Sequence, residues 1–252
     1  MIGDIVGRPG REAVRKILPD LRRQLELDIV VANGENAAGG LGITPDTARE
    51  IFSYGVDVIT SGNHIWDKKE IIPLLNDQAS VLRPLNYPDS TPGSGYVDVN
   101  GVLIVNLIGR VFVGNFDDPF RAMDNFLQQH QDAIIKIIDI HAEATSEKAA
   151  LGWYLDGRVS VVAGTHTHVA TADCRILPKG TGFVSDLGMC GAVNSIIGAE
   201  PEDVLNRFLD QIPHRLSFVK TGPVRFNSVM FDVDDFSGTV LLTERVDREF
   251  EY

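Results

Sequence analysis

Val161-Val-Ala-Gly-Thr-His166-Thr-His168 gives the clearest indication of the fold, because an apolar run of strand length ends there and two histidines follow it. Four other apolar runs end in the same manner, with Asp, Glu, Asn or His close behind the last apolar positions. They are Ile2-Gly-Asp4, Val30-Val-Ala-Asn-Gly-Glu35-Asn36, Val58-Ile-Thr-Ser-Gly-Asn63-His64 and Ile138-Asp-Ile-His141. Ligands of open α/β sheets bind beyond the carboxyl ends of the strands, so the five polar clusters are expected to meet at one edge.

Amphipathic patterns between these runs predict helices, and the alternation of strand and helix favours an α/β fold. The helices are predicted at 11–26, 44–55, from 67 onward, and at 119–131, 145–155 and 201–212. Asn100-Gly101 between two apolar runs predicts a hairpin, and 224–233 with 239–246 predicts two antiparallel strands. Together these patterns predict a four-layer α/β/β/α sandwich, with two sheets face to face, in a single domain spanning residues 1–252.

Local signals refine three of these helices. Thr44 is the expected N-cap before Pro45, and Asp67-Lys-Lys-Glu70 resembles a capping box. Pro19 is expected to kink the first helix. Only three residues precede Asp4, which is short for a buried strand, so we expect that native apolar residues precede Met1.

The composition excludes several functions. A formal net charge of −12 disfavours stable binding of a long nucleic acid, whereas a small anionic substrate is compatible with bound cations that reverse the local potential. The chain contains no stretch of about 20 apolar residues and no signal peptide, so no membrane association and a cytoplasmic location are expected. Cys174 and Cys190 are expected to be free thiols. The sequence leaves open whether the protein forms a homo-oligomer.

Each polar cluster also has a purely structural interpretation. Asp4 could cap a helix, Glu35, Asn36 and Asn63 could be turn residues, and His141 could be a satisfied core histidine. His166 and His168 are more specific, because alternate residues of an extended segment face the same side and both rings could point at one ion. Five strand ends that all carry such residues are far less expected by chance than any single one.

The combined set of side chains points to a transition-metal site. Imidazole, carboxylate and amide groups without cysteine suit iron, manganese, zinc or nickel better than calcium or magnesium. Glu35 could bridge two ions, and ions about 3.5–4 Å apart would clamp a phosphoryl group and generate a hydroxide. The residues therefore predict a two-metal phosphoesterase whose metal ligands are Asp4, Glu35, Asn36, Asn63, His141, His166 and His168.

These motifs resemble a known family. Gly3-Asp4, Gly34-Glu35-Asn36, Gly62-Asn63-His64 and Gly164-Thr-His166-Thr-His168 resemble the ordered motifs of calcineurin-like metallophosphoesterases. More narrowly, the stretches 34–40, 61–67, 139–148 and 163–169 resemble signatures of the YmdB-like branch. The chain departs from the wider superfamily where Val6 replaces a histidine and Glu35 replaces an aspartate. Both departures are typical of the branch, and they put general phosphatase or nuclease activity in doubt.

The resemblance implies a division of the ligands between two metals. One metal is expected to be bound by Asp4, Asn36 and His168. The other is expected to be bound by Asn63, His141 and His166, and Glu35 is expected to bridge the two. The resemblance implies iron as the metal, with manganese or zinc as alternatives.

The resemblance also implies that His64 is a general acid rather than a ligand, and that cyclic nucleotides, foremost 2′,3′-cyclic ones, are the substrates. A packing role for His64 is the competing interpretation, and helix capping is the preferred interpretation of Asp67. Two other functions stay open: a phosphomonoesterase that uses the same site, and a metal-dependent regulatory protein with weak hydrolysis.

Other residues near the predicted site have less specific patterns. Arg8, Arg11, Arg83 and Arg110 could contact phosphate, but surface solvation is the preferred interpretation. For Phe112, Phe116 and Phe120, core packing is preferred over a base-stacking surface. Residues 185–197, which include Asp186, are predicted to form a loop near the site, without an assigned role.

Overall fold

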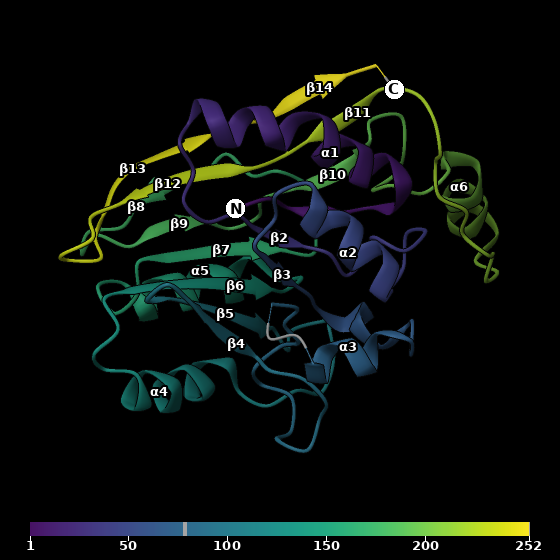
Figure 1. Ribbon diagram of the computed structural model, residues 1–252. Helices are drawn as coiled ribbons and strands as arrows, with labels where there is room; N and C mark the ends of the chain where they lie inside the picture. The colour runs from purple at the N-terminus through teal and green to yellow at the C-terminus, as the bar shows by residue number, and fades with distance from the viewer. Residues whose placement is uncertain (78–79, 252) are drawn as a thin grey trace.

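The computed structural model describes residues 1–77 and 80–251 and contains two groups of strands between helices (Figure 1). One sheet has six strands in the order β4-β5-β6-β7-β9-β8. These strands are β4 Tyr96–Val99, β5 Val102–Ile108, β6 Ile135–His141, β7 Val161–Thr165, β8 Arg175–Ile176 and β9 Gly182–Val184. The central strands β5, β6, β7 and β9 run parallel, and the edge strands β4 and β8 are antiparallel to their neighbours.

The second layer of strands is assembled from shorter pieces. Its largest sheet has the order β1-β10-β11-β14, and a parallel bridge from Ile2 to Ala32 connects β1 to the parallel pair β2-β3. An antiparallel pair, β12-β13, adjoins β8. The bounds are β1 Asp4–Ile5, β2 Val31–Asn33, β3 Val58–Thr60, β10 Met189–Ala192, β11 Val224–Phe226, β12 Val229–Val233, β13 Val240–Arg245 and β14 Arg248–Phe250.

Helices α1, α2 and α3 pack against one layer of strands and α4 and α5 against the other, whereas α6 lies apart, at the right of Figure 1. In Figure 1, α1 lies along the top of the view and α4 along the bottom. The helices are α1 Gly7–Gln24, α2 Pro45–Ser53, α3 Ile71–Asp77, α4 Pro119–Gln129, α5 Thr145–Leu155 and α6 Pro201–Asp210, and a 3-10 turn, η1, spans Asn63–Trp66. The predicted α/β/β/α sandwich is therefore confirmed.

Alternation along the strands explains the four layers. Ile138 and Ile140 of β6 pack in the cluster that contains Met123 of α4 and Leu151 of α5, whereas Ile137 packs on the opposite face, between the sheets. A slip of one residue would exchange these faces, and burial of each such side chain contributes about 1.5–3 kcal/mol. The register is therefore strongly specified, and it delivers the last residue of β6 to the carboxyl edge of the sheet.

Most local predictions are confirmed. Asn100 and Gly101 have φ angles of 54° and 87°, which suit the turn that joins β4 to β5. Thr44 accepts a hydrogen bond from the backbone N–H of Thr47 as the N-cap of α2. Helix α1 begins earlier than predicted, at Gly7, because Pro9 fits a first turn where its missing N–H is not needed. Cys174 and Cys190 are free thiols.

Three local predictions are wrong. Residues 185–197 are not all loop, because strand β10 lies within them and pairs with β1 and β11. Asp67 does not open a helix: it follows η1, and α3 begins only at Ile71. The segment 224–233 is not one strand, because β11 pairs with β10 and β14 whereas β12 pairs with β13. The break falls at Ser228, whose backbone N–H donates to the Asp247 carboxylate.

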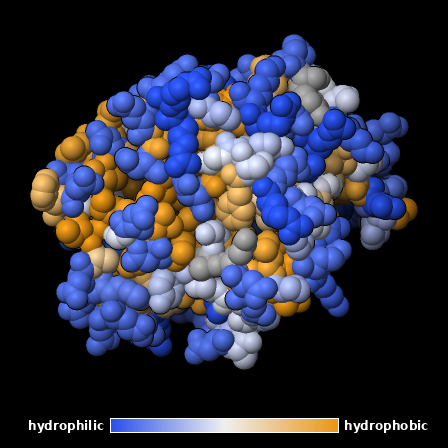
Figure 2. Space-filling model, viewed as in Figure 1, coloured by the Kyte–Doolittle hydropathy of each residue, from blue (hydrophilic) through white to orange (hydrophobic). Residues whose placement is uncertain are grey.

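The surface divides into apolar and polar areas. Figure 2 shows apolar side chains gathered on the left of the view, where Figure 1 places β12 and β13. Phe236, Leu241 and Leu242 are exposed in this region. In Figure 1 the parallel strands β5, β6 and β7 point to the right, away from this apolar area. The area is therefore separate from the carboxyl ends of these strands. Among the described helices, none has the length and apolar character needed to cross a bilayer.

Candidate metal centre

The carboxyl ends of five strands bring the predicted ligands together. Asp4 lies in β1, Glu35 and Asn36 follow β2, and Asn63 opens η1 after β3. His141 is the last residue of β6, and the turn after β7 carries His166 and His168. The seven side chains come from both sheets, so the site lies where the two carboxyl edges meet.

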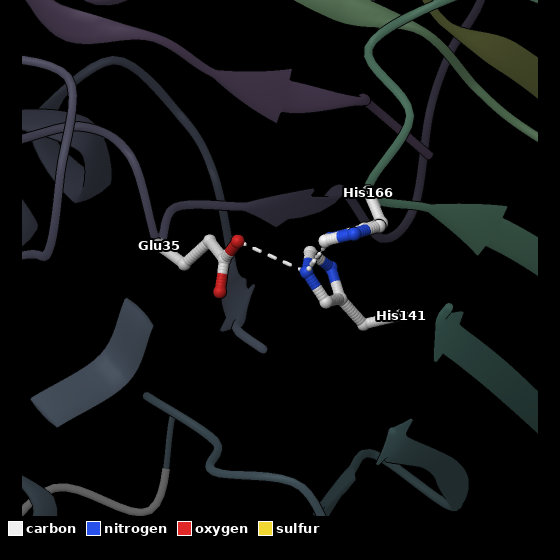
Figure 3. Close-up of side chains that lie close together, drawn as sticks. All are labelled: Glu35, His141 and His166. Atoms are coloured by element: carbon white, nitrogen blue, oxygen red, sulfur yellow. Dashed lines mark hydrogen bonds and ion pairs between the residues drawn. The ribbon is translucent and has the colours of Figure 1, made fainter. Parts of the chain in front are cut away.

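Glu35, His141 and His166 form the centre of this group, and Figure 3 shows their side chains pointing toward one another. Oε1 of Glu35 lies 2.9 Å from Nε2 of His141, which lies 2.9 Å from Nδ1 of His166. One ligand atom from each residue falls within 4.8 Å of the other two, so the three could hold a metal ion. Two imidazoles and a carboxylate suit a first-row transition metal.

The remaining four residues extend the centre in two directions. Oδ1 of Asn63 lies 3.2 Å from Nε2 of His141. On the other side, Nδ2 of Asn36 donates to Nε2 of His168 at 3.2 Å and to Oε1 of Glu35 at 3.4 Å. Oε1 of Glu35 therefore contacts residues of both expected ligand sets.

Asp4 provides the test of whether a cation fits this site. Its side chain is fully buried, and Oδ1 has no hydrogen-bond partner among the described residues. The same atom lies 3.8 Å from Nε2 of His168 and 3.9 Å from Nδ1 of His141. A buried carboxylate oxygen without a partner is costly unless a cation compensates it, so the residues fit a metal ion.

The electrostatics of the group are those of a crowded anionic site. Burial raises the pKa of Asp4. Burial alone would also raise the pKa of Glu35 and lower that of His141, but their mutual attraction outweighs it and brings the two pKa values to about 2 and about 9. Burial and the charge of His141 lower the pKa of His166 to about 3. A neutral His166 keeps a lone pair available for a cation.

Tight backbone approaches orient the ligands. A Cβ on Gly62 would lie 2.0 Å from Cδ2 of His141, so only glycine leaves room for this ring. Nδ1 of His141 lies 3.0 Å from Oγ1 of Thr165, whose hydroxyl donates to Asp139. This arrangement makes the hydroxyl oxygen an acceptor for Nδ1–H and turns Nε2 toward Glu35.

His168 is oriented from the predicted loop 185–197. Its Nδ1 lies 2.9 Å from the carbonyl oxygen of Ile197, which can only accept, so Nδ1 carries the proton and Nε2 faces Asp4 and Asn36. Ile197 has a φ of 48°, which is unfavourable for a β-branched residue. The strained backbone therefore directs this carbonyl group at a site residue, a link that no local signal in the sequence indicates.

His64 lies beside the ligands but is oriented differently. Its backbone N–H donates to Oε2 of Glu35 at 2.9 Å, and its Nδ1 hydrogen-bonds to Oδ2 of Asp67 at 2.7 Å. Its side chain is about one-third exposed, at 32%. The interpretation of Asp67 as a helix cap is therefore corrected: this carboxylate orients His64.

Two expectations about arginine and phenylalanine are also corrected. Arg83 is buried rather than solvated, because its guanidinium donates to the carbonyl oxygens of Pro84 and Leu85. Phe112 is 89% exposed and does not pack in the core. Phe120 packs against the cluster under α4 and α5, as expected.

The neighbouring aromatic residues form a wall that starts two residues after His64. Trp66 packs edge-on against Tyr87 at 5.8 Å between ring centroids, and Tyr87 packs against Phe116 at 5.2 Å. Burial raises the pKa of Tyr87, and the negative charge of Glu35 adds to this effect. The three rings are half-buried, and Tyr87 lies near enough to Glu35 to be affected by its charge.

The α/β/β/α sandwich is metallophosphoesterase-like, and the comparisons with known proteins agree. The family model described as YmdB-like protein matches residues 1–246, so the chain belongs to this family, as its motifs predict. A relative from Bacillus subtilis (strain 168), named 2′,3′-cyclic-nucleotide 2′-phosphodiesterase, is 45% identical over 250 residues, covering 97% of this chain and 94% of the relative.

Two solved structures have the same fold. A hypothetical protein from Thermus thermophilus has a TM-score of 0.92 at 44% identity, covering 98% of this chain and 97% of the other. A protein described as a novel phosphatase, from Mycoplasma pneumoniae, has a TM-score of 0.92 at 33% identity, covering 98% and 92%. The similarity extends over the whole sandwich, including every strand that carries a predicted ligand.

Proposed function

We propose that this chain is a two-metal phosphodiesterase that hydrolyses 2′,3′-cyclic nucleotides. The observation that carries the proposal is the convergence of seven N and O ligands on one buried edge, with Oδ1 of Asp4 unpartnered among the described residues. The similarity to the Bacillus subtilis relative, whose name specifies a 2′,3′-cyclic-nucleotide 2′-phosphodiesterase, supports the substrate class.

The contacts support a division into two metal sites. Asn63, His141 and His166 form one set, because the His141 ring contacts both of the others. Asp4, Asn36 and His168 form the second set, in which Nε2 of His168 contacts the side chains of both partners. Glu35, whose Oε1 contacts His141 of one set and Asn36 of the other, would bridge the two metals. We propose iron, which the resemblance to the YmdB-like branch implies and which mixed imidazole and carboxylate ligands allow, with manganese and zinc as alternatives.

The protein residues have distinct parts in the reaction. Two bound cations would supply the Lewis acid and the activated nucleophile of hydrolysis. The predicted ligand side chains would hold those cations at the carboxyl edge of the strands. His64 stands at the exposed rim, with Nδ1 held by Asp67 and Nε2 directed away from it, and donates a proton to the leaving ribose oxygen. Such a general acid contributes typically ~10²–10⁴ in rate.

The aromatic wall supports a nucleoside substrate. Trp66, Tyr87 and Phe116 form a run of half-buried rings that begins two residues after His64, and a purine or pyrimidine base has a flat face that stacks on such rings. Base–aromatic stacking is worth about 1–3 kcal/mol per base. A phosphodiester that carries a base would therefore bind better than one that lacks it.

Metal analysis and a substrate comparison test the proposal. Freshly purified protein should contain close to two transition-metal ions per chain and should hydrolyse 2′,3′-cyclic AMP to a monophosphate. Changing His64 to Ala should keep both ions but lower kcat by about 10²–10⁴. Faster turnover of a simple phosphomonoester than of the cyclic diester would favour the phosphomonoesterase alternative. Absence of both metal and activity would reject both functions.

A further inference from the structure

One buried carboxylate, that of Asp186, holds the turn that carries His166 and His168 through hydrogen bonds. Oδ2 of Asp186 accepts hydrogen bonds from the backbone N–H of Thr167 at 3.1 Å and from its hydroxyl at 2.7 Å. Oδ1 accepts from the backbone N–H of Gly188 at 2.8 Å. A single side chain therefore connects the residue between the two histidines to the segment that follows β9.

Lys148 of α5 reaches the same carboxylate from the other side of β7. Its Nζ lies 2.6 Å from Oδ2 of Asp186, and the two side chains are 1% and 2% exposed. The lysine crosses β7 at Gly164, where an added Cβ would lie 2.8 Å from Cδ of Lys148 and 1.9 Å from the carbonyl oxygen of Ser185. Gly164 therefore leaves the space through which Lys148 and Asp186 meet.

A buried ion pair is by itself weak evidence of added fold stability. Removing two charges from water costs about as much as their attraction returns, and apolar replacements of similar volume are often neutral or stabilising. What the pair holds is a strained turn. His166 and His168 have φ angles of 104° and 64°, in the left-handed region that residues with a Cβ rarely adopt. Thr167, which donates two hydrogen bonds to Asp186, lies between them.

We infer that Asp186 and Lys148 are positioning residues of the metal centre. Through Thr167 they hold the turn so that Nδ1 of His166 faces Glu35 and His141 while Nε2 of His168 faces Asp4. The inference rests on the proposed function, because it takes both histidines as metal ligands. Outer partners that orient ligands typically contribute 10–100-fold to metal affinity or activity.

Titration of Mn²⁺ alone into metal-stripped protein, followed by calorimetry, tests the inference. Thr167→Val removes the hydroxyl tie without burying a new charge, and it should weaken Mn²⁺ binding about 10–100-fold. Thr167→Ser keeps the hydroxyl and should bind Mn²⁺ with an affinity close to that of the wild type. The double change Lys148→Met with Asp186→Asn leaves no unpaired charge and should weaken binding at least as much. With saturating metal, kcat should fall while KM stays within about twofold of wild type.

Asp156 offers a matched control at the opposite end of the sheet. It is buried, and its carboxylate accepts from the backbone N–H groups of Lys179 and Thr181, just before β9. Asp156→Asn should lower the melting temperature but leave Mn²⁺ affinity unchanged. Wild-type affinity in both Thr167→Val and the double variant, or equal weakening in Asp156→Asn, would overturn the positioning role.

The histidine variants separate failure of the inference from failure of the proposed function. His166→Ala and His168→Ala should each lose Mn²⁺ binding more severely than Thr167→Val does. If both bound Mn²⁺ as wild type does, the proposed ligand set itself would be wrong and the positioning role would fall with it. If the histidine variants lost Mn²⁺ binding but Thr167→Val and the Lys148→Met, Asp186→Asn double variant bound Mn²⁺ as wild type does, the ligand set would stand. The inference alone would then fail.

Discussion

Oδ2 of Asp67 lies 2.7 Å from Nδ1 of His64, at the end of the 3-10 turn that follows β3. A carboxylate in this position keeps the proton on Nδ1, so Nε2 is the atom available to the substrate. The pair has the geometry of a histidine oriented for proton transfer. It also shows that a short turn, rather than a helix, presents the proposed acid at the rim of the site.

Changing Asp67 to Asn should therefore lower kcat without removing metal. We expect a loss of about 10–100-fold, less than that of His64→Ala, because the ring remains but its orientation is no longer held. Steady-state kinetics on 2′,3′-cyclic AMP would measure it. Glu70→Gln is the matched control, since Glu70 is exposed and completes the same Asp-x-x-Glu pattern. Equal losses in the two variants would count against the orienting role.

Changing Glu35 to Gln should reduce the metal content from two ions to one or none. The bridging charge would be lost, and the contact with Nε2 of His141 would weaken. Elemental analysis of the purified variant gives the stoichiometry. Glu147→Gln is a suitable control, because Glu147 is another buried glutamate that accepts only from backbone N–H groups of Arg110 and Val111 among the bonds described. Two tightly held ions in Glu35→Gln would argue against bridging.

Metal removal should lower the melting temperature of the wild-type protein. An ion that binds only the folded state stabilises it by about 2.7 kcal/mol at 100 times its Kd. Asp4→Asn should shrink the difference between metal-loaded and stripped protein, because it removes both a proposed ligand and a buried charge whose Oδ1 has no hydrogen-bond partner in the described part of the chain. Thermal unfolding with Mn²⁺ and with chelator measures the difference in melting temperature for each protein. If Asp4→Asn showed the same difference as wild type, Asp4 would not belong to the ligand set.

Changing Gly62 to Ala should abolish activity through His141. The new Cβ would overlap the His141 ring at 2.0 Å from Cδ2, and that ring is too buried to move freely. Gly191→Ala is a milder control, because its Cβ would meet the flexible Met189 sulphur at 3.3 Å. Metal content and kcat, compared between the two variants at equal folded fraction, give the result. Normal activity in Gly62→Ala would contradict this close packing of Gly62 against the ring.

The aromatic wall leads to a prediction about substrate preference. Tyr87→Leu and Phe116→Leu should raise KM for 2′,3′-cyclic AMP about tenfold, as expected from losing 1–3 kcal/mol of stacking. The same variants should leave KM unchanged for glycerol 1,2-cyclic phosphate, a five-membered cyclic diester without a base. Parallel changes for both substrates would show that the rings support the fold of the site rather than the base.

Much of the architecture could be predicted from local patterns. Period-two alternation around Ile137 and Ile138, together with Asn100-Gly101, depends only on neighbouring residues, and these signals correctly indicated the sheets and a hairpin. Asp67, Arg83 and Phe112 were misinterpreted for one shared reason. A capping-type carboxylate, a loop arginine and a loop phenylalanine have several uses, and the local path of the backbone decides which one applies: Asp67 and Arg83 bond residues one to three positions away, and Phe112 is left exposed.

The sequence by itself determined which chemical groups stand at the strand ends, because strand length, a following glycine and the next polar residue are local properties of the chain. Only the tertiary structure decided which atom of each group faces inward. Nε2 of His168 faces Asp4 because the carbonyl oxygen of Ile197 accepts a hydrogen bond from Nδ1–H, and Asp186 holds the strained turn through its hydrogen bonds to Thr167. Those partners are remote in sequence, so packing alone brings them into contact.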